Sequence, residues 1–147
     1  QKVVRSLCET LGLNPDTQTP TRQVVKHIGE SLVKAMQMAQ KGADPAAAQL
    51  VAAECVVHAE TKDHANWELL GKVAEAATGD LGKALKAAHE AVEKQEDHHL
   101  YHTKGWSREL AIEALGMPAV LPPPEEVKKV ETAIGASRAE QQREAML

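Results

Sequence analysis

Three long segments with helical character, joined by very short turns, constrain the fold of this chain most strongly. They cover residues 20–40, residues 44–77, and a stretch that begins at residue 81 and extends to residue 101 or 115. Prolines at the starts and glycines after the ends are ordinary helix signals. Turns this short force consecutive helices to become antiparallel neighbours. Within the third segment, Gly105 is where we expect a kink or a break.

Shorter segments flank this region. Residues 1–19 are expected to form a short amphipathic helix and a linker, because a glycine and an Asn-Pro turn end the apolar pattern there. Residues 117–124 contain four prolines and are expected to be an extended connector. A polar helix should follow, from residue 127 to about 146. We therefore divide the chain into an N-terminal helix with linker (1–19), a helical-bundle domain (20–116), and a proline-rich connector with a C-terminal helix (117–147).

The apolar residues are of a kind that favours closely packed helices. The chain has no Phe, one Tyr and two Trp, and alanine runs through its middle. Small side chains let helix backbones approach closely. We predict an all-α antiparallel helical bundle. The small-residue core and the polar C-terminal helix also predict a homodimer.

Charge and cysteine content argue against several classes of protein. The formal charge of −4, with acidic and basic residues interspersed, provides no basic stripe for a nucleic acid. No apolar run reaches the roughly 20 residues that cross a bilayer, so we expect no membrane partner. Cys8 and Cys55 form no Cys-x-x-Cys motif and are interpreted as buried small hydrophobes in a cytoplasmic protein. The chain begins with Gln1, as a segment of a longer protein would.

The histidines are concentrated in one part of the chain. Six of the seven lie between His58 and His102, and three of them fall within residues 95–102. Imidazole is the commonest transition-metal ligand and titrates near neutral pH. A metal site on the second and third long segments is the hypothesis that follows.

Helical periodicity places polar residues on the apolar face of the third segment. At 100° per residue, one stripe runs through residues 81–110 and contains mostly Ala, Leu and Val. Gln95, His99 and His102 lie in the same stripe. We expect these three side chains to point toward the core.

The second segment is apolar nearly all round in its first half, so its orientation depends on its second half. There the pattern indicates a buried face that also carries Asp63 and Asn66, with Glu60 on its border. A rotation of about 60° would bring Glu54 and His58 inward instead.

Residues equally distant from the turn at about Gly79 should lie level across the two helices. Ala59 then meets His99, and Asp63 meets Gln95. Carboxylates and imidazoles from facing helices can surround an iron, manganese or zinc ion. The candidate metal ligands are Glu60, Asp63, Glu96, His99 and His102.

These motifs resemble those of the ferritin-like family, four-helix bundles that often hold two iron or manganese ions. The family signature is a Glu on each of two helices and Glu-x-x-His on each of the other two. Here Glu96-x-x-His99 matches one copy, and Glu60-x-x-Asp63 is a variant without the histidine. The first long segment departs from the family, because Glu30 points outward by its periodicity. The resemblance implies a ferritin-like bundle that binds a transition metal, and the departure on the first long segment argues against a full di-iron centre with ferroxidase activity.

A metal-free interpretation of the same residues stays open. Polar groups inside an alanine-rich core can satisfy one another in a hydrogen-bond network with Asn66 and Gln95. The chain would then be a helical scaffold that acts through protein contacts. No catalytic residue is assigned. The remaining histidines of this region are expected to be solvated surface residues, namely His58, His64, His89 and His98.

Overall fold

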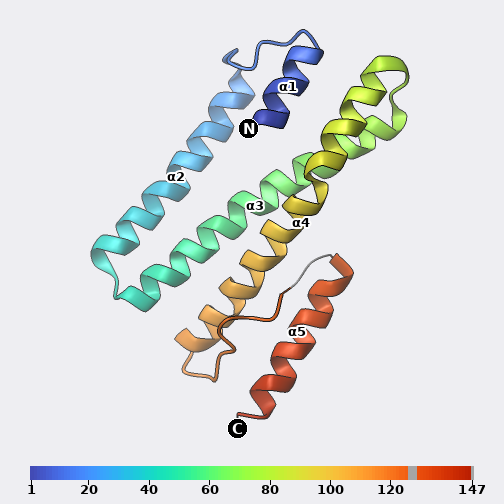
Figure 1. Ribbon diagram of the computed structural model, residues 1–147. Coiled ribbons are helices and arrows are strands. Elements are labelled where there is room, and N and C mark those ends of the chain that lie inside the picture. The colour runs from blue at the N-terminus through green and yellow to red at the C-terminus, as the bar shows by residue number, and fades with distance from the viewer. Residues whose placement is uncertain (126–128, 147) are drawn as a thin grey trace.

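The computed structural model describes residues 1–125 and 129–146, and this part of the chain forms five helices without a strand (Figure 1). The helices are α1 (Lys2–Thr10), α2 (Pro20–Gly42), α3 (Pro45–Ala76), α4 (Gly79–Ala114) and α5 (Lys129–Glu144). The predicted all-α class is confirmed. The predicted boundaries of the three long helices are also right to within a few residues.

Side-chain caps explain where α2 and α3 begin. The Thr19 hydroxyl accepts a hydrogen bond from the Arg22 N–H at 3.1 Å. The Asp44 carboxylate accepts bonds from the N–H groups of Ala46 and Ala47 at 3.0 and 3.1 Å. Such caps satisfy N–H groups that have no partner in the first turn of a helix. A proline follows each cap, which fixes the backbone for the helical turn.

The turn into α4 is tight, and α4 itself is unbroken. Gly79 has a φ of 65°, a left-handed conformation that glycine adopts without a steric penalty. The helix then continues to Ala114 through Gly105, which is buried. The expected break at Gly105 is therefore wrong. Packing around the glycine outweighs its low helix propensity.

Helices α2, α3, α4 and α5 lie side by side in that order, and α1 packs against α4 (Figure 1). The contact between α3 and α4 is the most extensive. Among the described residues, α2 contacts α3 but does not reach α4. As a result, α2 leaves several apolar side chains exposed, namely Val24, Val25, Ile28, Val33 and Met38. The homodimer stays a prediction.

The core lies mainly between α3, α4 and the connector. Its buried apolar residues are Cys55, Trp67, Leu85, Ala88, Leu100, Tyr101, Leu110, Val120 and Ala139. Both cysteines are free thiols; Cys55 is buried as predicted, whereas Cys8 is only half-buried. In the described part of the chain, none of the helices combines the length and apolar character needed to cross a bilayer.

The orientation of α3 differs from the prediction. Asp63 and Asn66 are exposed, and the neighbouring residue His64 is buried together with Trp67. The assignment of His64 to the solvated surface is therefore wrong. A helix that is apolar nearly all round has several similar ways to bury its surface, and a hydrogen bond between His64 and the Asp97 carboxylate of α4 favours this one.

The connector and α5 both contact α4. Residues 117–124 are non-helical as predicted, and Val120 and Pro123 are buried. Helix α5 begins at Lys129 and packs against α4. The predicted start of this helix at Val127 lies outside the described residues.

Candidate metal site

Helices α3 and α4 bring two glutamates and one histidine together. Glu60 belongs to α3, and Glu96 and His99 lie one turn apart on α4. One ligand atom of each lies within 4.8 Å of the others. His99 Nδ1 is 3.9 Å from a carboxylate oxygen of Glu60. The predicted alignment of Ala59 with His99 is therefore right to within one residue.

Asp63 extends this group. Its side chain shares a hydrogen bond with Glu96. Burial, this hydrogen bond and the negative charges of Asp63 and Glu60 raise the pKa of Glu96, against the opposite effect of His99. Glu96 thus holds its proton more strongly than an isolated glutamate does. We call Glu60, Asp63, Glu96 and His99 the α3–α4 cluster.

The raised pKa of Glu96 predicts a pH dependence of the metal-free protein. A carboxyl whose folded pKa is raised contributes stability at low pH, and this contribution is lost as the pH rises through the folded pKa. In EDTA, Glu96→Gln should therefore become more stable relative to wild type as the pH rises from 4.5, the ordinary pKa of the group, to 7. Thermal unfolding at several pH values measures this difference. A difference that stays constant, or that shrinks, would contradict the prediction.

The α3–α4 cluster lies at the edge of the helix pair and not in a dry interior. The side chains of His99 and Glu60 are 41% and 26% exposed, and Gln95 is exposed. The expectation that Gln95 and His99 occupy core positions is wrong, because α4 turns Leu100 and Tyr101 inward instead. An ion could enter this edge from solvent and keep water in its remaining coordination positions.

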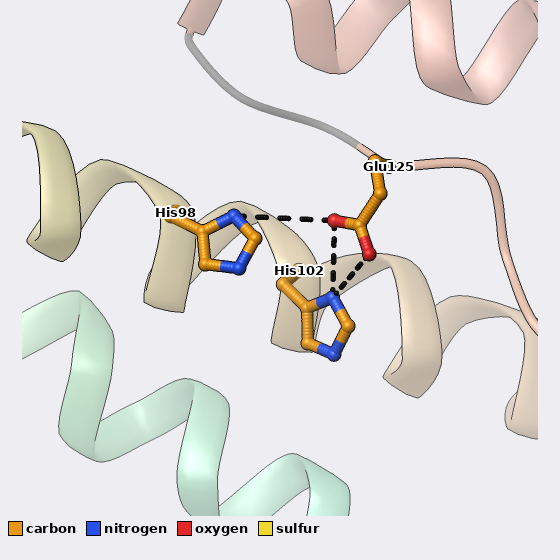
Figure 2. A group of neighbouring side chains, drawn as sticks. All are labelled: His98, His102 and Glu125. Atoms are coloured by element: carbon orange, nitrogen blue, oxygen red, sulfur yellow. Dashed lines mark hydrogen bonds and ion pairs between the residues drawn. The ribbon is translucent and has the colours of Figure 1, made fainter.

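His102, the fifth candidate ligand, does not join the α3–α4 cluster. It faces the connector, where its Nδ1 lies 3.1 and 3.2 Å from the carboxylate oxygens of Glu125 (Figure 2). The side chain of His102 is 40% exposed, so it does not occupy the core either. The structure brings four of the five candidates together and places His102 in a separate group.

Buried His64 lies beside the α3–α4 cluster and was missed by the sequence analysis. Its Nε2 is 2.7 Å from a carboxylate oxygen of Asp97, and its ring meets Tyr101 edge-on with centroids 6.0 Å apart. Burial and the charge of Asp97 raise the pKa of Tyr101. The available signal was spacing, because His64 lies four residues after Glu60 and three before Trp67 on one helical face.

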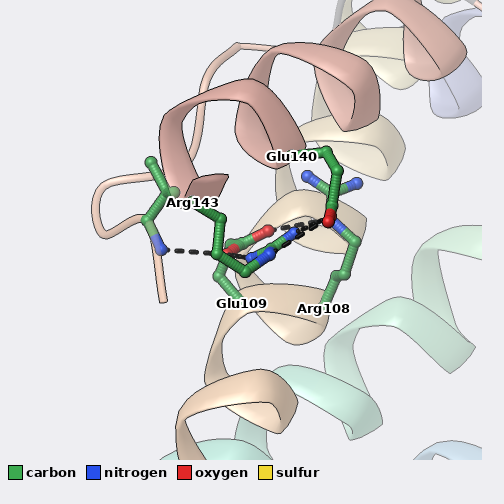
Figure 3. A network of polar contacts seen from close by, with 5 residues as sticks. Arg108, Glu109, Glu140 and Arg143 are labelled. Atoms are coloured by element: carbon green, nitrogen blue, oxygen red, sulfur yellow. Dashed lines mark hydrogen bonds and ion pairs between the residues drawn. The ribbon is translucent and has the colours of Figure 1, made fainter. Parts of the chain in front are cut away.

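A second buried polar group ties the C-terminal part of the chain to α4 (Figure 3). The Glu109 side chain is 0% exposed. It accepts hydrogen bonds from the Val120 N–H at 2.9 Å, from Arg143 at 2.8 Å and from Arg108 at 3.0 Å. Burial acts to raise the pKa of Glu109, but these hydrogen bonds outweigh it and the pKa is lowered. Sequence periodicity gave no sign of this group, because two of its partners, Val120 and Arg143, are distant in the chain.

The donors of the α3–α4 cluster suit a divalent transition metal. Carboxylate oxygens favour ions such as Mn²⁺ and Fe²⁺, and an imidazole nitrogen adds preference for iron or zinc over magnesium and calcium. Metal ligands must be deprotonated, so metal binding at this cluster would compete with protonation of Glu96.

Comparisons with known proteins place the chain in no family. No family model matches it, and neither a curated protein nor a solved structure does. The functional argument therefore depends on the geometry of the side chains.

Proposed function

We propose that the chain is a ferritin-like helical protein that binds one divalent transition-metal ion, iron or manganese, at the α3–α4 cluster. The observation that carries the proposal is the convergence of Glu60, Glu96 and His99 from two helices, with ligand atoms within 4.8 Å of one another. The Glu-x-x-His spacing on α4 puts two of these donors on one helical face. The third donor comes from α3, where Glu60 lies 3.9 Å from His99 Nδ1 at the edge of the helix pair.

The electrostatics of the α3–α4 cluster also favour a cation. Three carboxyl groups lie close enough for Asp63 and Glu60 to raise the pKa of Glu96. Like charges in a partly buried site repel one another, and a bound cation relieves this repulsion. A bound cation would therefore remove electrostatic repulsion that destabilises the metal-free cluster.

The supply of donors supports one ion and not two. Carboxylate-bridged pairs of ions in ferritin-like bundles use four glutamates and two histidines from four helices. Glu30 of α2 is exposed and pairs with Lys26 at 3.7 Å, away from the α3–α4 cluster. We therefore expect a single ion per chain at this cluster, and no ferroxidase reaction that needs two.

Manganese binding tests the proposal directly. Titration of the metal-free protein with Mn²⁺, followed by the loss of the free-ion electron paramagnetic resonance signal, should show one site per chain. Glu96→Gln and His99→Ala should each weaken this site by roughly tenfold or more, because each removes a direct ligand. In anaerobic titrations with Fe²⁺, wild type should likewise bind more tightly than Glu96→Gln and His99→Ala.

The control is Glu90→Gln, which removes one negative charge from an exposed position on α4. Glu90 pairs with Lys86 at 3.8 Å and lies outside the α3–α4 cluster. Its Mn²⁺ affinity should match wild type. Equal affinities in Glu96→Gln and wild type would refute the proposal. Absence of Mn²⁺ and Fe²⁺ binding in the folded wild-type protein would favour the metal-free scaffold instead.

A further inference from the structure

His98, His102 and Glu125 form a second group of metal-binding donors, which shares no residue with the α3–α4 cluster. His98 and His102 lie one turn apart on α4, and Glu125 follows the run of prolines in the connector (Figure 2). One ligand atom of each lies within 4.8 Å of the others. We infer that these three side chains bind a zinc ion that fastens the connector to α4, a site beyond the proposed function.

Both imidazoles present the same nitrogen to the same carboxylate. His102 Nδ1 is 3.1 Å from one oxygen of Glu125, and His98 Nδ1 is 3.9 Å from the other. The two rings lie 5.5 Å apart with a tilt of 31°. The three donor atoms thus lie close together, and Figure 2 shows both ring nitrogens beside the carboxylate of Glu125.

The distances between the donor atoms are close to those that zinc requires. Ligands at about 2.0–2.1 Å from a tetrahedral zinc lie roughly 3.3 Å from one another. The separations of 3.1 and 3.9 Å need only small side-chain movements to reach this value. These movements are easy, because the His98 and Glu125 side chains are 50% and 57% exposed.

The identity of the donors suits zinc. Two histidines four residues apart on a helix are the spacing that zinc sites use on one helical face. Two imidazoles and one carboxylate form a known zinc donor set, with the fourth position left to water. Calcium and magnesium prefer oxygen ligands throughout. The second group should therefore prefer a different metal ion from the carboxylate-rich α3–α4 cluster.

A zinc ion at this position would have a structural effect. The connector is already held near its start, where Glu109 accepts a hydrogen bond from the Val120 N–H. Prolines between Val120 and Glu125 restrict the backbone. An ion on Glu125 would add a second attachment point to α4, so that the connector is fixed at both ends.

Zinc titration of Glu96→Gln tests this site in a variant whose α3–α4 cluster is weakened. Isothermal titration with ZnCl₂ should show one ion bound per chain. Adding His98→Ala or His102→Ala to this variant should weaken binding by roughly tenfold or more, and so should adding Glu125→Gln. Cobalt(II) in place of zinc should give visible absorption typical of a four- or five-coordinate ion, and the same substitutions should remove that absorption.

The matched control is His27→Ala, which removes an exposed histidine from α2. It should leave zinc binding and the cobalt spectrum unchanged. Zinc binding of unchanged affinity in a folded variant that carries both His98→Ala and His102→Ala would overturn the inference. An equal loss of affinity in His27→Ala would overturn it too, because the ion would then bind exposed histidines without a defined site. Failure of manganese binding at the α3–α4 cluster would not affect this result.

Discussion

Replacing Glu109 by alanine should lower the free energy of unfolding by about 3–5 kcal/mol, the cost of removing one partner from a buried ion pair. The Glu109 carboxylate has no exposed surface and accepts three hydrogen bonds, from Val120, Arg108 and Arg143. Its loss leaves the Arg143 guanidinium and the Val120 N–H without this acceptor. These donors belong to the connector and α5, so both should loosen from α4. Urea unfolding followed by circular dichroism measures the change.

Hydrogen exchange locates the effect of this substitution. Amides of α5 and of the connector should exchange faster in Glu109→Ala, whereas those of α3 should lose less protection. The control is Glu140→Gln, whose side chain is 61% exposed and pairs with Arg143 at 2.8 Å. An exposed ion pair contributes about 0.2–1 kcal/mol, so this variant should stay close to wild type. Equal destabilisation of the two variants would show that the buried carboxylate does not anchor the C-terminal part.

The second large effect is expected at Gly82, where α4 begins beside the end of α3. A Cβ atom at this position would press on the carbonyl oxygen of Ala77 and lie 2.9 Å from its carbonyl carbon. A backbone carbonyl in a two-residue turn has little freedom to move away. Gly82→Ala should therefore cost about 2 kcal/mol, since overpacking by 1–3 kcal/mol exceeds the gain of up to about 1 kcal/mol in helix propensity. The unfolding temperature should fall by about 5 °C.

Gly29→Ala in α2 adds the same methyl group, but here we expect the protein to become more stable. A Cβ atom at Gly29 meets nothing within 4 Å, so only the helix propensity changes. The variant should gain about 0.5–1 kcal/mol. Differential scanning calorimetry of both variants tests the pair. Stabilisation of Gly82→Ala to the same extent as Gly29→Ala would mean that the turn after α3 accommodates a side chain.

The α3–α4 cluster shows which features of a site can be predicted from sequence patterns. The grouping of Glu60, Glu96 and His99 depended on two local facts, the Glu-x-x-His spacing and the turn at Gly79. Both are encoded in short stretches of chain, so the alignment of the helices could be predicted to within one residue. The solvent exposure of His99 could not be predicted, because it depends on which face of α4 the whole of α3 covers.

Local chemistry by itself determined the helices of this protein. Threonine and aspartate caps, prolines in first turns and a left-handed Gly79 act within a few residues of each helix end. Their effect is the same whatever the rest of the chain does. The sequence therefore specified the all-α class and the positions of α2, α3 and α4.

The tertiary structure alone decided which polar residues are buried and which donors meet. Helix α3 is apolar nearly all round, so its rotation, and with it the burial of His64, was set by the sum of many similar contacts with α4. Glu109 met Arg143, and His102 met Glu125, because the proline-rich connector turns back along α4. Such contacts join residues that are 34 and 23 positions apart, and no local pattern records the path of the chain between them.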